Sequence, residues 1–255
     1  MLQNLTIAGM VISLYKVFDT LAGVVLLCFL FLQTAKYREL LPTILKGQRK
    51  RTMIVFAELI IISVLLLPLW FFLNRSFAKW FTNGNANYYG NITAWMIVLT
   101  LLPIVFKVSP LKTMDLLTPA LPLSLFTAKL ACFFHGCCSG IEMPGSFYYN
   151  QYTERYEFPV QLLEALVALG IFFFLQIRKK KIPMGEVFPV YLIVYSASRF
   201  LTEFLRDDLP RVFSAFNAYQ ILSVIYFLLG VYLYMLVREK GKTIQSYFDA
   251  KRKQS

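Results

Sequence analysis

The sequence predicts an all-α integral membrane protein of about seven transmembrane helices, with its N-terminus outside and its C-terminus in the cytoplasm. Three observations lead to this fold class. Apolar residues make up 58% of the chain and the mean hydropathy is +0.58, which exceeds what a soluble core of 255 residues requires. Apolar runs of membrane-spanning length recur along the chain. Lys and Arg gather in alternate connections between those runs.

Seven apolar runs lie close to the roughly 20 residues that a helix needs to cross a hydrocarbon core of about 30 Å. We predict spans at residues 8–33, 53–73, 91–107, 115–134, 159–177, 186–205 and 217–237. Pro119 and Pro122 interrupt the fourth, so we expect it to be broken or half-inserted. The first residues lack the positive charge and the small-residue cleavage site of a signal peptide, so we expect the first run to be retained.

The distribution of basic residues orients the spans. The first, third and fifth connections and the C-terminal tail hold 18 Lys and Arg, whereas the even-numbered connections hold 5. The positive-inside rule then places the N-terminus outside. Because the net charge of +12 falls between apolar runs, we interpret it as anchoring to anionic lipids and not as nucleic-acid binding. Residues 1–255 are interpreted as one transmembrane domain, with a basic cytoplasmic tail at 239–255.

Charged residues inside the predicted spans indicate a functional cavity, because they are costly in hydrocarbon. Arg199, Glu203 and Arg206 fall within about 60° of one another on a helix, so Glu203 can pair with either arginine. Two arginines for one carboxylate leave a positive charge for an anion, and a phospholipid phosphate suits the arginine fork. The alternative interpretation is a structural ion pair at the end of a span.

Weaker signals come from other charges in the apolar runs. Lys129 lies deep in such a run, and we favour a functional or paired role over snorkelling. Asp115 precedes the fourth run, where capping its own helix is the simpler interpretation. Glu164 also falls inside a predicted span.

A cysteine-rich segment follows the fourth span, and three chemistries remain open for it. Cys132, His135, Cys137 and Cys138 are ligand types that suit zinc or copper. A redox-active or disulfide-bonded pair is the second option, and packing of small polarizable side chains is the third. His135 is the only histidine, so any histidine base must be this residue.

Six short segments share one further pattern. They are Asp115-Leu-Leu-Thr-Pro-Ala-Leu-Pro, Ala128-Lys-Leu-Ala-Cys-Phe-Phe-His-Gly, Phe158-Pro-Val-Gln-Leu-Leu-Glu-Ala, Gly185-Glu-Val-Phe, Arg199-Phe-Leu-Thr-Glu-Phe-Leu-Arg and Tyr219-Gln-Ile-Leu-Ser. In order and spacing these segments resemble the motifs of the prolipoprotein diacylglyceryl transferase family, and the similarity runs from about residue 89 to 223.

The resemblance implies a bacterial cytoplasmic-membrane enzyme that moves diacylglyceryl from phosphatidylglycerol, or another anionic phospholipid, to a cysteine thiol of a lipoprotein precursor. We expect no cofactor and no resident metal. The predicted catalytic residues are Lys129, Arg199, Glu203, Tyr89 and His135. The predicted phospholipid-binding residues are Arg206, Tyr15, Asp115, Cys132, Cys137, Gly140, Gln161 and Glu164.

Four positions depart from the family pattern. Lys129 stands in place of a signature arginine, which keeps the charge but loses the bidentate fork. Cys132 and Cys137 replace an asparagine and a glutamate. Tyr89 falls where the family has a histidine that is proposed as a base, and a tyrosine with a pKa of about 10 is a poorer base at neutral pH.

These departures leave three hypotheses. The first is an active lipid-group transferase, which requires Arg199 and Lys129 to face one lipid-accessible cavity. The second is a non-catalytic lipid-binding or maturation protein on the same scaffold. The third is a membrane thiol or metal protein centred on the cysteine-rich segment.

Overall fold

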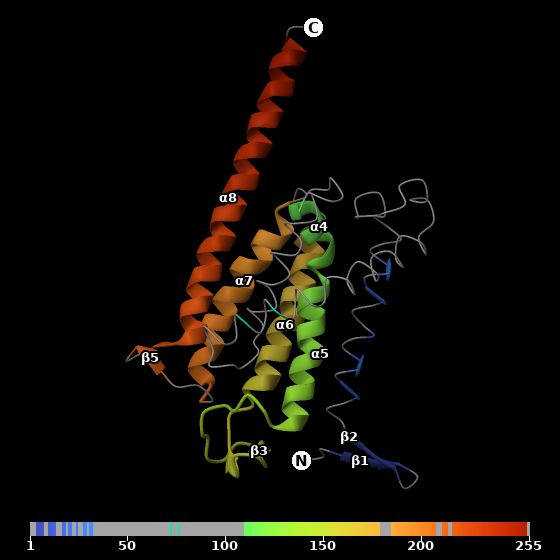
Figure 1. Ribbon diagram of the computed structural model, residues 1–255, viewed down its shortest axis with the longest axis vertical. Helices are drawn as coiled ribbons and strands as arrows, with labels where there is room; N and C mark the ends of the chain where they lie inside the picture. Colours follow the sequence, from blue (N-terminus) through green and yellow to red (C-terminus); the bar gives the residue numbers. More distant parts are fainter. Residues whose placement is uncertain are drawn as a thin grey trace.

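The computed structural model describes residues 4–7, 10–13, 110–178, 185–207, 211–213 and 216–253, together with single residues between 17 and 76. It is mostly helical, as Figure 1 shows. The helices are α4 (Pro110–Leu117), α5 (Ala120–His135), α6 (Val160–Arg178), α7 (Val187–Thr202) and α8 (Ala218–Lys253), and a 3-10 turn, η3 (Glu203–Leu205), follows α7. Consecutive helices from α5 to α8 pack on one another, and α4 also packs on α7.

Three short antiparallel hairpins accompany the helices. They are β1 (Asn4–Ile7) with β2 (Met10–Ser13), β3 (Tyr149–Asn150) with β4 (Arg155–Tyr156), and β5 (Arg211–Phe213) with β6 (Phe216–Asn217). The β3–β4 hairpin belongs to the connection between α5 and α6, which lies at the lower end of the bundle in Figure 1. This connection, residues 136–159, is called the outer loop below.

Two described helices are long and apolar enough to cross a membrane: α6, with mean hydropathy 2.1, and residues Ala218–Glu239 of α8, with mean hydropathy 2.0. They match the predicted spans 159–177 and 217–237 to within a few residues at each end. α5 is apolar but shorter. The second and third predicted spans lie outside the described residues, apart from Phe72 of the second span, which is helical.

The first predicted span is wrong at its start. Residues 10–13 form β2, which pairs with β1 from Asn4↔Ser13 to Ile7↔Met10, and the helical residues described in this span begin at residue 17. Short apolar runs rich in β-branched residues fit a strand as well as a helix, so hydropathy alone did not separate the two.

The fourth predicted span is broken, as expected, but only at its first proline. Thr118 and Pro119 separate α4 from α5, and the Thr118 hydroxyl donates to the Met114 carbonyl at 2.8 Å. Pro122 lies in the first turn of α5, where its missing N–H has no helical partner to lose.

Asp115 caps a different helix from the one predicted. Its buried carboxylate accepts hydrogen bonds from the backbone N–H groups of Gly185, Val187 (3.2 Å) and Phe188 (2.8 Å) at the start of α7. These are the orphan donors of a helix N-terminus, which favours negative charge. The break after α4 therefore lets one carboxylate connect α4 to α7.

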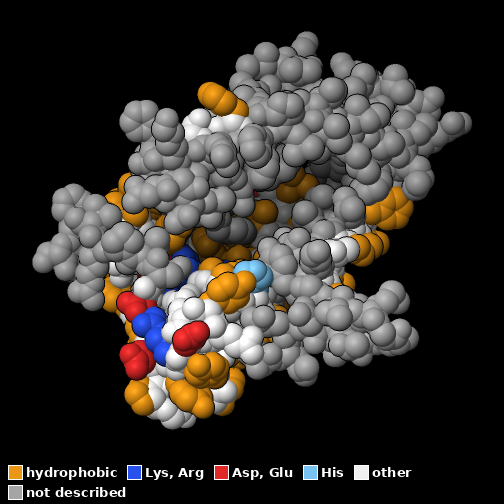
Figure 2. Space-filling view, turned by 60° about the horizontal axis from the view of Figure 1, so that its bottom comes forward, with side chains coloured by type: hydrophobic (Ala, Val, Ile, Leu, Met, Phe, Trp, Pro, Cys, Tyr) orange, Lys and Arg blue, Asp and Glu red, His pale blue; other side chains and the backbone are white. Residues whose placement is uncertain are grey.

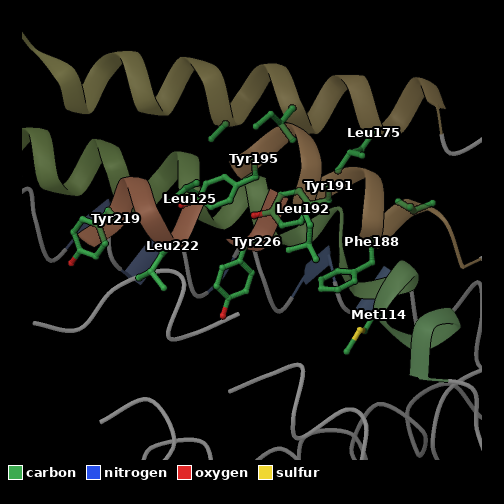
Figure 3. Packing of buried hydrophobic residues seen from close by; sticks show 13 residues of the cluster. Met114, Leu125, Leu175, Phe188, Tyr191, Leu192, Tyr195, Tyr219, Leu222 and Tyr226 are labelled. Carbon is green, nitrogen blue, oxygen red and sulfur yellow. The ribbon is translucent and has the colours of Figure 1, made fainter. Parts of the chain in front are cut away.

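The apolar core centres on α7, which lies between α6 and α8. Tyr191 and Leu192 are fully buried there, and Figure 3 shows them among Leu175 of α6 and Tyr226 of α8. At Gly230 of α8, an added Cβ would come within 3.0 Å of the Leu192 Cβ. A small residue at this point allows the two backbones to approach closely.

We expect Asp115→Ala to lower the free energy of unfolding by roughly 1–3 kcal/mol, because buried N–H groups of α7 lose their acceptor. The matched variant, Asp115→Asn, keeps one side-chain oxygen and is expected to fall between Asp115→Ala and the wild type. Thermal unfolding in detergent measures both variants. Equal stability of Asp115→Ala and the wild type would contradict the capping role.

Candidate active site

Five charged side chains from three helices meet inside the bundle. Lys129 comes from α5, Glu164 from α6 and Arg199 from α7, while Glu203 and Arg206 lie at and beyond the end of α7. Each side chain is 13% exposed or less. We call these residues the charged cluster. They include every charged residue that the sequence predicted for the site except Asp115.

Glu164 is the centre of the charged cluster. Its Oε2 lies 2.5 Å from the Lys129 Nζ, and its Oε1 accepts from Arg199 and lies 3.5 Å from the Arg206 Nη1. One carboxylate of α6 thus contacts a cation of α5, a cation of α7 and a cation of the segment after α7.

Glu203 is the second carboxylate of the cluster. Its Oε2 lies 2.7 Å from the Arg199 Nη2, and its Oε1 lies 3.7 Å from the Arg206 Nε. The Asn217 Nδ2 also donates to it at 3.1 Å. The predicted pairing of Glu203 with both arginines is therefore confirmed.

The predicted continuous helix through residue 206 is wrong. The α-helix ends at Thr202, a 3-10 turn follows, and Arg206 is extended, with φ −109° and ψ 149°. Arg206 forms an antiparallel bridge with Gly140 of the outer loop. The chain thus leaves the helix axis before Arg206, yet the arginine still reaches both carboxylates.

Among the five residues of the charged cluster, three cations face two carboxylates. Lys129 and Arg199 line a small cavity of about 20 Å³, whose walls include Leu125, Val167 and Tyr195. This is about the space of one water molecule. The two cations therefore line one cavity. The transferase hypothesis also requires this cavity to be accessible to lipid, and that part stays a prediction.

Asp115 does not join the charged cluster. It contacts the first turn of α7, whereas Arg199 lies in the last turn, roughly 18 Å further along the helix at 1.5 Å per residue. Its contacts within the described residues identify a cap and bring it near none of the predicted phosphate-binding side chains.

Three thiols gather where α5 ends. The sulfur atoms of Cys132, Cys137 and Cys138 all lie within 4.8 Å of one another, and each residue is partly buried. We call these residues the thiol cluster. The helix ends at Gly136 with φ 86°, and Cys138 has φ 63°. Hydrogen bonds from the other two thiols hold the pKa of Cys138 well below its ordinary value.

His135 does not join the thiol cluster, so among the described residues the metal option that included it does not hold. Its ring stacks on Tyr152, with centroids 5.1 Å apart, and its Nε2 lies 3.5 Å from the Tyr152 hydroxyl. The side chain therefore packs on the outer loop. Figure 2, which looks at this end of the bundle, shows the single histidine at the surface beside apolar side chains.

Gln161 and Gly140 connect the outer loop to the bundle. Gln161 of α6 is fully buried, and its Nε2 donates to the Cys137 carbonyl at 2.8 Å. Gly140 packs so closely that an added Cβ would lie 2.1 Å from the Phe158 carbonyl oxygen. Both residues thus position backbone near the thiol cluster and Arg206. Their predicted contact with phospholipid stays a prediction.

Glu157 is a buried carboxylate that sequence reasoning missed. It accepts hydrogen bonds from Gly140 N (3.2 Å), Asn150 Nδ2 (3.0 Å), Thr153 Oγ1 (2.5 Å) and Arg155 Nε (2.9 Å). Its place directly before the Phe158-Pro motif was the one available signal. Glu157 fixes the outer loop in the same way that Glu164 fixes the helices.

Arg155 and Tyr148 make further contacts within and around the outer loop. Arg155 also pairs with Asp207 at 2.9 Å, and its two carboxylate partners raise the pKa of the guanidinium. Burial raises the pKa of Tyr148 to about 12, and the Tyr148 hydroxyl donates to the Phe133 carbonyl at 3.2 Å.

Two predicted site residues, Tyr15 and Tyr89, lie outside the described residues.

Comparison with known proteins places this geometry in a family context. A family model described as prolipoprotein diacylglyceryl transferase matches residues 4–236. The phosphatidylglycerol–prolipoprotein diacylglyceryl transferase 2 of Clostridium perfringens is 28% identical over 162 residues, which cover 60% of this chain and 63% of the relative. The Streptococcus uberis transferase is 26% identical and the Chlorobaculum tepidum transferase 30% identical, over 69% and 65% of this chain and 70% and 60% of the relatives. The chain thus spans less than two thirds of the first relative.

We expect Gly140→Ala to destabilise the outer loop, because its Cβ has no room beside the Phe158 carbonyl. A loss of roughly 1–3 kcal/mol is typical of overpacking. Gly170→Ala is the control, since an added Cβ there meets no atom within 4 Å and alanine favours a helix. Thermal unfolding and limited proteolysis of the outer loop measure the difference. Equal unfolding temperatures and equal proteolysis of the two variants would show that the close contact at Gly140 does not affect stability.

We expect Glu164→Gln to cost about 3–5 kcal/mol of stability, because three buried cations lose their shared carboxylate. Glu142→Gln, in the exposed part of the outer loop, is the matched control and is expected to remain within about 0.5 kcal/mol of the wild type. Denaturation in detergent measures both. A Glu164→Gln variant as stable as the control would show that the cluster tolerates more positive charge.

Proposed function

We propose that this chain, which belongs to the prolipoprotein diacylglyceryl transferase family, transfers the diacylglyceryl group of phosphatidylglycerol to a cysteine thiol of a lipoprotein precursor. The observation that carries the proposal is the charged cluster, in which three nearly buried cations share two carboxylates. The relatives are named for phosphatidylglycerol and prolipoprotein.

The chemistry explains the need for cations. The acceptor thiol loses its proton to solvent, and its sulfur attacks the carbon that joins the diacylglyceryl group to the phosphate. A C–S bond forms, and the bond from that carbon to the phosphate oxygen breaks. The electron pair stays on the departing phosphate oxygen, so glycerol phosphate leaves with one more negative charge. Fixed donors at that oxygen stabilise the transition state without reorganising at the moment of reaction.

Each member of the charged cluster has a proposed role. Arg199 and Arg206 bind the phosphate oxygens, because guanidinium groups suit bidentate contact. Lys129 contributes a compact charge that turns from Glu164 toward the leaving oxygen. Glu164 and Glu203 hold the arginines in place when no substrate is bound. The phosphate then brings its own negative charge to the arginines and Lys129.

We further propose that the chain spans a bacterial cytoplasmic membrane about seven times, with the outer loop outside and the C-terminus of α8 inside. The 18-to-5 asymmetry of Lys and Arg supports this orientation. The site would then open to the side on which lipoprotein precursors present their cysteine. Two apolar helices of spanning length agree with membrane insertion.

We expect Arg199→Ala and Lys129→Ala each to reduce turnover by roughly 10²–10³-fold, the usual loss when one donor to a developing anion is removed. Lys129→Arg, which restores the bidentate fork, is expected to retain activity. Arg178→Ala, on the exposed end of α6, is the control. Release of labelled glycerol phosphate from phosphatidylglycerol and the mass gain of a lipobox peptide measure the reaction.

The same assay tests the non-catalytic alternative. Folded wild-type protein that binds phosphatidylglycerol vesicles but releases no glycerol phosphate would contradict the transferase proposal and favour a lipid-binding protein. Turnover that is insensitive to Arg199→Ala would contradict the assignment of the charged cluster.

A further inference from the structure

We propose that Cys132, Cys137 and Cys138 bind one zinc ion, and that its open fourth position takes the cysteine thiol of the lipoprotein precursor. This inference rests on the proposed function, because it assigns the step that activates the acceptor thiol. It differs from the expectation of no resident metal, which the sequence motifs alone suggested.

The positions of the sulfur atoms carry the proposal. All three lie within 4.8 Å of one another. Three thiolates on one zinc ion, each about 2.3 Å from the metal, would be separated by about 4 Å. Small side-chain rotations therefore bring the three sulfurs to zinc-binding separations. Three protein ligands and one open position are the arrangement of a catalytic zinc site.

The backbone around the thiol cluster is held in an unusual conformation. Cys138 has φ 63°, a region that non-glycine residues rarely occupy, at a cost of about 1–3 kcal/mol. The buried Gln161 fixes the neighbouring peptide through the Cys137 carbonyl. Gly136, at φ 86°, ends α5 directly before the two adjacent cysteines. Together these features turn two successive side chains toward Cys132.

The thiol cluster and the charged cluster are about one helical turn apart. This spacing holds along α5, and also along α6, where Gln161 contacts the thiol cluster. On α5, Cys132 follows Lys129 by three residues. On α6, Gln161 precedes Glu164 by three residues. Residues with this spacing have Cβ atoms about 5–6 Å apart on one helix face. A thiol bound at the zinc would therefore lie beside a phosphate bound by the cations.

The charges of the two clusters complement each other. Zinc with three thiolates would carry a net charge of −1, and it would lie beside the three cations of the charged cluster. The incoming thiol loses its proton to water when it binds the metal, because a coordinated thiol is deprotonated. Its sulfur then attacks the glycerol carbon, the C–O bond to phosphate breaks, and the thioether product leaves the metal. One proton reaches the solvent for each diacylglyceryl group transferred.

This activation supplies a role that the family pattern gives to a histidine. Tyr89 stands at that position, and His135 contacts Tyr152 of the outer loop. A thiolate is the nucleophilic form of cysteine, and metal coordination is one of the ways by which proteins generate it at neutral pH. In this proposal, metal coordination by the three cysteines replaces a histidine base as the means of deprotonating the acceptor thiol.

Metal content tests the binding step. The full chain is purified in detergent under reducing conditions with zinc, and zinc per chain is measured by mass spectrometry. We expect about one zinc for the wild type and for Cys28→Ser, whose cysteine is exposed and lies outside the thiol cluster. Ser substitutions at 132, 137 or 138 should weaken zinc binding by at least about 100-fold. Equal zinc content in all variants, or a disulfide between two cluster cysteines, would overturn the proposal.

Cobalt(II) tests the open position on wild-type protein, so this test does not depend on variants that fold poorly. Cobalt replacing zinc should give thiolate-to-metal charge-transfer absorption. A lipobox peptide with its cysteine should shift the d–d bands, whereas the same peptide with serine should not. No charge-transfer absorption, or an equal response to both peptides, would overturn the proposal.

Different experimental outcomes would refute the zinc site and the transferase function. Glycerol phosphate release that persists in metal-free protein and in Cys138→Ser would refute the zinc site and leave the transferase function standing. A cobalt-loaded protein that responds to the cysteine peptide but releases no glycerol phosphate would keep the thiol site and refute the transferase function.

Discussion

The arrangement of α5, α6 and α7 depends on the carboxylate of Glu164. In an apolar bundle, three cations from separate segments would repel one another and remain unsolvated without it. Glu164 contacts all three, and Glu203 adds a second contact to the two arginines. These ion pairs therefore hold α5, α6 and α7 together inside the bundle.

A second carboxylate plays the corresponding role outside the helices. Glu157 collects four donors of the outer loop, and the close packing of Gly140 brings that loop against the strand-like segment that carries Arg206. The position of Arg206 is thus decided by the loop as much as by α7. The thiol cluster lies at the root of the same loop, where α5 ends. The outer loop consequently supports both Arg206 and the thiol cluster.

Residues that match the family motifs and residues that depart from them have different proposed roles. The charged cluster keeps the carboxylates and arginines of the family motifs, with Lys129 in place of an arginine. Two of the four departures, Cys132 and Cys137, lie at the end of α5 and in the first residues of the outer loop, whereas Lys129 lies within α5 and Tyr89 lies outside the described residues. A soft-metal site beside the cations is a single alteration that accounts for the cysteines together.

The sequence by itself determined the membrane class, the helices α6 and α8, the break at Pro119 and the pairing of Glu203 with Arg199, because hydropathy, proline and helical spacing act within one element. It misplaced the start of the first span, because a short β-branched run suits a strand or a helix. Only the tertiary structure decided that Asp115 caps α7, that Glu157 organises the outer loop, that Lys129 shares Glu164 with Arg199, and that His135 is separate from the three thiols. Each of these depends on which helices pack together and on where the chain turns between them, and residues from different elements carry no fixed spacing along the sequence.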